Sequence, residues 1–96
     1  MITQKKIIEI LKKNQPFLKE RFKVSKIGLF GSFIRGEENE KSDIDILVEV
    51  DPSIGWYFID LKDLLEEKLG RKVDLVSSRA LHPMLRDDIL NEVIYI

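Results

Sequence analysis

Residues 43–50 alternate between two kinds of side chain, and this pattern constrains the fold more than any other feature of the sequence. Successive side chains of a β-strand point to opposite faces, so a period of two residues indicates a strand. One face would carry Ile44, Ile46 and Val48, and the other Asp43, Asp45, Leu47 and Glu49. The segment is therefore predicted to be a strand with one apolar face and one face that carries carboxylates.

Helical and strand-like segments alternate along the rest of the chain. Helices are predicted at 3–22, 56–69 and 84–92, and further strands at 24–30, 71–76 and, as a short edge strand, 93–96. Thr3 is expected to cap the first helix, Pro16 to kink it or restart it after Asn14, and Gly70 to end the second helix. Because no repeat and no flexible linker interrupts this alternation, we predict one α/β (α+β) domain that spans residues 1–96.

Two features of the connecting segments are expected to be structural. Trp56 and Tyr57 begin the second long helix, and we expect that helix start to bury them, although aromatic side chains can also stack on a base or meet a partner. His82, the single histidine, precedes Pro83 at a helix entrance. It is therefore expected to be a cap or loop residue and not a catalytic base.

The absence of cysteine excludes several classes of protein. Without a thiol the chain cannot form a disulfide scaffold, a thiolate zinc site or a cysteine nucleophile, and it suits a reducing compartment. No apolar run reaches the roughly 18 residues of a membrane span, and the charged start of the chain does not read as a signal peptide. We therefore expect a soluble, cytoplasmic protein that does not contact a membrane.

The net charge of −1 conceals two oppositely charged regions. Residues 1–26 carry a charge of +6, and the remaining residues carry −7. A basic helix can attract phosphate or an acidic partner, but a solvated helix face explains it equally well. The acidic region would repel nucleic acid unless some of its acids surround a cation, so stable nucleic-acid binding is not expected.

Three aspartates are the strongest candidates for chemistry. Asp43 and Asp45 would lie on one face of their strand, about 6 to 7 Å apart, which a solvated strand start also explains. Asp74 lies in an otherwise apolar strand, where an acid needs an edge position or a partner. If the two strands are neighbours, three carboxylates meet, and a hard dication is the simplest neutralising ion. We therefore predict Mg²⁺ here, with two ions that support in-line attack on a phosphoryl group.

The Gly31-Ser32 pair is the candidate phosphate site. It follows a predicted strand and opens a helical turn, which exposes backbone N–H groups and a hydroxyl to phosphate oxygens. Arg35 lies one turn later, where its guanidinium can reach the same phosphates. An ordinary strand-to-helix connection can contain the same pair, and neither a P-loop nor a G-x-G-x-x-G fingerprint is present.

Together these motifs resemble a known family. Gly31-Ser32, ten further residues, Asp43-x-Asp45 and a later strand with Asp74 form a pattern similar to the nucleotidyltransferase superfamily that includes DNA polymerase β. The runs LFGSFIRG (29–36), SDIDILV (42–48) and GRKVDLV (70–76) resemble its smallest branch, the minimal nucleotidyltransferases of the MntA antitoxin type. The resemblance covers nearly the whole chain. It implies a polymerase β-like palm, with a small mixed sheet flanked by helices.

The resemblance also implies a role for each candidate residue. Phosphate binding is assigned to Gly31, Ser32 and Arg35, and catalysis together with metal binding to Asp43, Asp45 and Asp74. Asp74 would also help to deprotonate the attacking hydroxyl. The implied reaction is Mg²⁺-dependent transfer of AMP from ATP to an acceptor hydroxyl, with release of pyrophosphate.

The length of the chain bears on the identity of the acceptor. Larger relatives add domains that hold DNA, tRNA or an aminoglycoside, and 96 residues leave no room for one. In the minimal branch the usual partner is a separately encoded all-helical HEPN protein, typically an RNase toxin. The resemblance therefore implies an antitoxin of a type VII toxin–antitoxin system, which adenylylates a tyrosine of its HEPN toxin.

Two alternative functions remain open. One is a nucleotidyltransferase that acts on a small molecule or an RNA end. The other is a non-catalytic antitoxin that neutralises its partner by contact, for which the basic residues 1–26 are suited. Both a homo-oligomer and a hetero-oligomer with the partner are compatible with the sequence, and no residue specifies the nucleotide base.

Overall fold

The structure is a computed structural model that describes residues 2–96. Its helices are α1 (Gln4–Phe22), α2 (Ser32–Arg35), α3 (Tyr57–Leu69) and α4 (Pro83–Glu92), and its strands are β1 (Val24–Phe30), β2 (Ile44–Val50), β3 (Val73–Ser77) and β4 (Ile94–Tyr95). Two 3₁₀ turns, Pro52–Ile54 and Ser78–Ala80, connect β2 to α3 and β3 to α4. Every helix and strand predicted from the sequence is present, with bounds that differ by a few residues.

The four strands form one mixed sheet in the order β3-β2-β1-β4. β1 is antiparallel to both β2 and β4, whereas β2 and β3 are parallel. The parallel pair is connected through α3, as a parallel crossover requires. The predicted fold class, a small mixed sheet flanked by helices, is confirmed.

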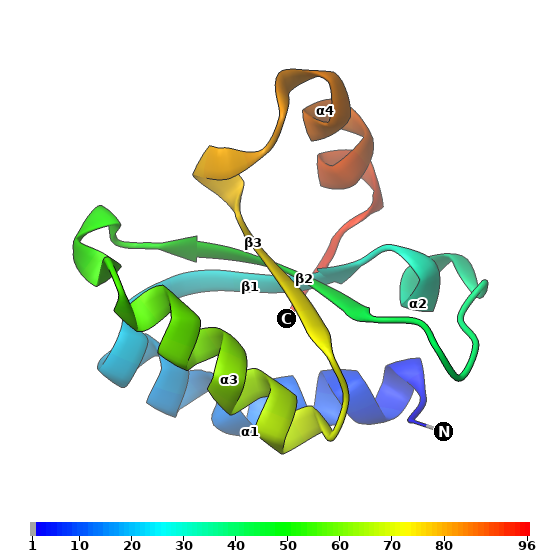
Figure 1. The fold of residues 1–96 in the computed structure, drawn as a ribbon, viewed down its shortest axis with the longest axis horizontal. Helices are drawn as coiled ribbons and strands as arrows, with labels where there is room; N and C mark the ends of the chain where they lie inside the picture. The colour runs from blue at the N-terminus through cyan, green and yellow to red at the C-terminus, as the bar shows by residue number, and fades with distance from the viewer. Residues whose placement is uncertain (1) are drawn as a thin grey trace.

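The helices cover the two faces of the sheet unequally. α1 and α3 lie together against one face, and α4 lies on the opposite face (Figure 1). The larger apolar cluster lies beneath α1 and α3, and Ile44, Ile46 and Val48 of β2 contribute to it. A smaller cluster beneath α4 is built on Phe30, Leu47 and Leu81. The alternating pattern of β2 therefore divides its apolar side chains between the two faces as predicted.

Helix α1 runs through Pro16 without interruption, so the predicted restart after Asn14 is wrong. Proline removes one backbone hydrogen bond from a helix interior. Ile7, Leu11 and Leu18 are fully buried on either side of that position, and this packing stabilises both halves of the helix against the sheet. The predicted caps are confirmed, because the Thr3 hydroxyl accepts from the Lys6 N–H at 3.2 Å and Gly70 ends α3 in a left-handed conformation.

The predicted burial of the aromatic residues at the start of α3 is wrong. Trp56 is 87% exposed and Tyr57 is 67% exposed. The helix packs through Leu61, Leu65 and Leu69, and in its first turn Phe58 is the residue that contacts the core. Three other large apolar side chains of the helices, Phe17, Ile59 and Leu85, are about half exposed.

The remaining local predictions concern α4 and membrane contact. The His82 imidazole accepts a hydrogen bond from the Met84 N–H at 3.2 Å, so its predicted role as a helix cap is confirmed. Within residues 2–96, none of the helices combines the length and the apolarity that crossing a bilayer requires.

Candidate active site

The parallel pairing of β2 and β3 brings two of the three candidate aspartates side by side. Asp45 and Asp74 are direct register partners, and Asp43 lies one residue before β2. The condition set from the sequence, that these two strands be neighbours, is met. Because β3 is an edge strand, Asp74 is exposed to solvent, which satisfies the condition that an acid in an apolar strand lie at an edge.

Arg71 holds the loop that leads into Asp43. Its guanidinium donates from Nε to the Ser42 carbonyl at 2.6 Å and also donates to the Asn39 carbonyl. The same guanidinium lies over the Phe33 ring, 5.4 Å from its centroid. One side chain therefore links the loop before β2 to helix α2 and to the start of β3.

The Gly31 turn lies directly against the Asp45 carboxylate. Gly31 follows β1, and Phe30 of that strand is the register partner of Asp45. A Cβ atom at Gly31 would overlap Asp45 Oδ2 and would come within 2.8 Å of Cγ. Gly31 also has φ 78° and ψ −152°, a region that side chains strongly disfavour. Glycine at this position therefore allows the backbone and the carboxylate to meet.

Helix α2 places the other two candidate phosphate-binding residues beside this turn. Ser32 is half-buried at the first position of α2, and Arg35 is its last residue. Gly36 then ends the helix in a left-handed conformation and donates its N–H to the Ser32 carbonyl. Three residues of the sequence motif thus lie within one helical turn, at the end of β1.

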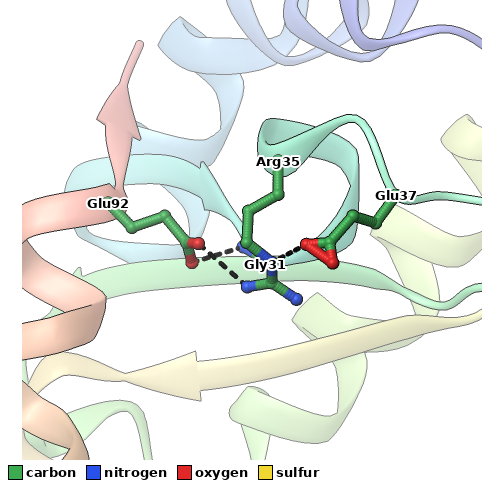
Figure 2. A network of polar contacts seen from close by, with 4 residues as sticks. All are labelled: Gly31, Arg35, Glu37 and Glu92. Carbon is green, nitrogen blue, oxygen red and sulfur yellow. Dashed lines mark hydrogen bonds and ion pairs between the residues drawn. The ribbon is translucent and has the colours of Figure 1, made fainter.

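Glu92 of α4 bridges two of these residues, and it was not predicted from the sequence. Its Oε2 accepts from the Gly31 N–H at 2.9 Å, and its Oε1 accepts from Arg35 Nη1 at 2.8 Å (Figure 2). Arg35 Nε donates in addition to Glu37 Oε1 at 2.6 Å. The two carboxylates raise the pKa of Arg35. For Glu92, burial alone would raise the pKa, but the bonds from Gly31 and Arg35 outweigh it and lower the pKa.

The Asp45 carboxyl has the most perturbed acidity at the site. Partial burial, the negative charge of Asp74, a side-chain hydrogen bond with Asp74 and the charge of Asp43 raise its pKa from 3.8 to about 6. The positive charge of Arg35 opposes this rise only in part. The rise therefore reflects burial first and the negative charges of the neighbouring aspartates second.

Two hollows are lined in part by the aspartates. One of about 280 Å³ is lined by Gly31, Arg35 and Asp45 on one side and by Leu85, Asp88, Ile89 and Glu92 of α4 on the other. The second, of about 520 Å³, is lined by Asp43 and Asp74 with Lys62, Glu66, Arg71, Lys72 and Val73. Asp45 thus faces the hollow that contains the phosphate motif, and Asp74 faces the other.

The chemistry of the three aspartates fits a magnesium site. Carboxylate oxygens are the ligands that Mg²⁺ prefers, and a dication would relieve the repulsion that raises the Asp45 pKa. Within the described residues 2–96, however, no three acidic, histidine or cysteine side chains are already grouped closely enough to hold a metal ion. The carboxylates of Asp43, Asp45 and Asp74 would therefore have to draw together on binding.

Comparison with known proteins assigns the family. A sequence model described as a nucleotidyltransferase domain matches residues 5–96, so the chain belongs to the nucleotidyltransferase domain family and is an enzyme of that class. Its relatives include protein adenylyltransferase MntA of Thermococcus cleftensis, which is 44% identical over 98 residues that cover 100% of this chain and 98% of that protein. The resemblance proposed from the motifs is confirmed.

Solved structures agree with this assignment. A structure assigned as a minimal nucleotidyltransferase has a TM-score of 0.78 and 33% identity, over 97% of this chain and 95% of that one. A toxin–antitoxin structure with AMP-PNP has a TM-score of 0.64 and 31% identity, over 98% of this chain and 72% of that one. The structure of a tri-AMPylated Shewanella oneidensis HEPN toxin in complex with MNT antitoxin has a TM-score of 0.53 and 29% identity, over 95% of this chain and 66% of the matched chain.

The raised pKa of Asp45 predicts a pH dependence of stability. Between pH 3.8 and about 6 the native state binds more protons at Asp45 than the unfolded chain does. The contribution of Asp45 to the free energy of unfolding therefore falls as the pH rises. The full shift corresponds to about 3 kcal/mol. Because Asp45 is only half-buried, solvent screening reduces the expected effect to about 1 kcal/mol.

Chemical unfolding in EDTA, from pH 4 to pH 7, measures this effect. The quantity to follow is the free energy of unfolding of the unaltered protein minus that of Asp45→Asn. The difference is needed because Asp51 and Glu92 have lowered pKa values and act in the opposite direction at lower pH. A difference that does not change across this range would show that Asp45 ionises normally.

Proposed function

We propose that the chain is a Mg²⁺-dependent protein adenylyltransferase that transfers AMP from ATP to a tyrosine hydroxyl of a HEPN toxin and so acts as its antitoxin. The observation that supports the proposal is the contact between the Gly31 turn, which is the proposed phosphate motif, and the Asp45 carboxylate, with Asp74 beside it. MntA of Thermococcus cleftensis and the AMPylated HEPN toxin of Shewanella oneidensis support the activity and the acceptor. The cytoplasm, which supplies ATP, is the proposed compartment.

In this mechanism the phosphate motif orients the nucleotide. The Gly31 N–H and the Ser32 hydroxyl donate to oxygens of the triphosphate, and the Arg35 guanidinium neutralises part of its charge. Mg²⁺, when bound by the three aspartates, supplies further charge neutralisation at the phosphates. Fixed donors of this kind stabilise charge as it develops, so positioning and electrostatics provide most of the rate.

Asp74 is proposed to handle the proton. Its exposed position on the edge strand leaves it open to an acceptor that approaches from another molecule. The acceptor oxygen forms a bond to the α-phosphorus, the bond to the pyrophosphate oxygen breaks, and the hydroxyl proton passes to Asp74. The products are the AMP ester of the acceptor and pyrophosphate.

Incubation of the protein with α-labelled ATP, Mg²⁺ and the product of the neighbouring gene is expected to label that second protein on tyrosine. Each of the four labelled ribonucleoside triphosphates is used in turn, and we expect ATP to label most strongly. Mass spectrometry after digestion locates the modified residue. Absence of labelling with all four nucleotides would exclude the proposed activity.

Two other results would redirect the assignment. Labelled product that survives protease digestion would indicate a small-molecule or RNA acceptor. Suppression of the toxin in cells by Asp43→Asn combined with Asp45→Asn would indicate neutralisation by contact, for which charge reversal at Lys12 and Lys13 of α1 is the complementary test.

A further inference from the structure

The carboxylate of Glu92 occupies the position at which a phosphate would be expected. Its two oxygens accept from the Gly31 N–H and from the Arg35 guanidinium, one bond to each donor, as two oxygens of a phosphate would (Figure 2). Bonds from a guanidinium to a carboxylate and to a phosphate share this paired geometry. The proposed phosphate donors therefore already hold an anion that belongs to the same chain.

The Glu92 side chain is largely shielded from solvent where it makes these two bonds. The Glu92 side chain is only 21% exposed, and its pKa is lowered despite that burial. Glu92 also lines the 280 Å³ hollow together with Asp45, so it lies at the side of the site that faces the phosphate motif. A nucleotide phosphate cannot reach the same two donors while Glu92 holds them.

The helix that carries Glu92 is lightly anchored. No residue of α4 is fully buried, and it contacts the small cluster of Phe30, Leu47 and Leu81 through partly buried Ile89 and Leu90. The strand that follows, β4, pairs with β1 over two residues, and the Ile96 N–H donates one further backbone bond to the Ile27 carbonyl at 2.9 Å. Elements with few buried contacts open at low free energy, so α4 can move without disturbing the core beneath α1 and α3.

We propose that Glu92 is an intramolecular competitor for the triphosphate. In the closed form Glu92 occupies the Gly31 and Arg35 donors, and in the open form α4 has moved and the donors are free. This inference rests on the proposed function, because it assumes that those donors bind phosphate. The observed affinity for nucleotide is then the intrinsic affinity reduced by the fraction of open protein.

Glu92→Gln is expected to tighten ATP binding about tenfold, because it removes the charge that holds Arg35 while it retains a side chain of equal length. Isothermal titration with ATP and Mg²⁺ measures the affinity, and thermal unfolding verifies that the variant is folded. Asp88→Asn is the matched control, because Asp88 lines the same hollow on α4 but is exposed. If Glu92→Gln tightens binding because Glu92 no longer occupies the Gly31 and Arg35 donors, Asp88→Asn changes the affinity for ATP less than about twofold.

Equal tightening by both variants would indicate general charge repulsion and would overturn the inference. Unchanged or weaker binding by Glu92→Gln, or no ATP binding by either protein, would also overturn it. A readout on the unaltered protein is independent of the variants: saturating ATP is expected to accelerate hydrogen exchange in α4, and exchange that slows or stays constant contradicts the proposed movement.

The two proposals fail separately. If Glu92→Gln tightens ATP binding but no acceptor protein is labelled, the adenylyltransferase proposal fails while the competition stands on the binding data. If the acceptor is labelled but the variant binds ATP no more tightly, only the competition is wrong.

Discussion

Asp45→Asn is expected to lower the rate of AMP transfer by about 10³-fold. Asp45 contacts the Gly31 turn and is the register partner of Asp74, so it is the one of the three candidate aspartates that lies against the proposed phosphate motif. A metal ligand of this kind contributes several kcal/mol of charge stabilisation, and each 1.4 kcal/mol corresponds to about a factor of ten in rate. Single-turnover labelling of the acceptor protein by excess enzyme measures the loss.

Stability measurements separate this loss from unfolding. At pH 7.5 without metal, Asp45→Asn removes a partly buried charge and is expected to be at least as stable as the unaltered protein. Mg²⁺ is expected to raise the melting temperature of the unaltered protein and to have less effect on the variant. Glu49→Gln, on the same face of β2 but remote from Asp74, should transfer AMP normally. A variant that retains a tenth or more of the activity would exclude Asp45 from the catalytic set.

The fold was predictable because its signals are local. The alternation over residues 43–50 defines β2 and its two faces, and Thr3 and Gly70 define helix ends through their own hydrogen-bonding and backbone preferences. Which side of a helix packs against a sheet depends on residues elsewhere in the chain. The exposure of Trp56 and the continuity of α1 through Pro16 therefore required the structure.

The site was predictable in part for the same reason. Asp45 and Asp74 could be brought together on the single assumption that their strands are neighbours, and the sheet places them in register. Glu92 has no such signal, since it lies 61 residues after Gly31 in the sequence and resembles any acid at the end of an amphipathic helix. Its role depends on α4 folding back over the end of β1, which no local pattern specifies.

Gly31→Ala is expected to destabilise the protein by about 3 to 5 kcal/mol and to abolish nucleotide binding. The backbone angles of Gly31 lie in a region that is nearly exclusive to glycine, which makes a side chain unfavourable by about 1 to 3 kcal/mol. Overlap of the new Cβ with the Asp45 carboxylate adds a similar amount. Thermal unfolding should show a decrease in melting temperature of about 15 °C or more for a chain of this size.

Gly36→Ala is the control that separates these two effects. Gly36 also has a positive φ of 73°, but nothing lies within 4 Å of a Cβ atom there, so only the backbone term of about 1 to 2 kcal/mol applies. The excess destabilisation by Gly31→Ala then contains the contact with Asp45 together with the difference between the two backbone terms, because Gly31 has ψ −152° and Gly36 has ψ 23°. In an Asp45→Ala background the overlapping Oδ2 and Cγ are absent, and this excess should decrease. An excess that is unchanged in that background would mean that the turn and the carboxylate do not meet, and the contact on which the proposed function rests would be wrong.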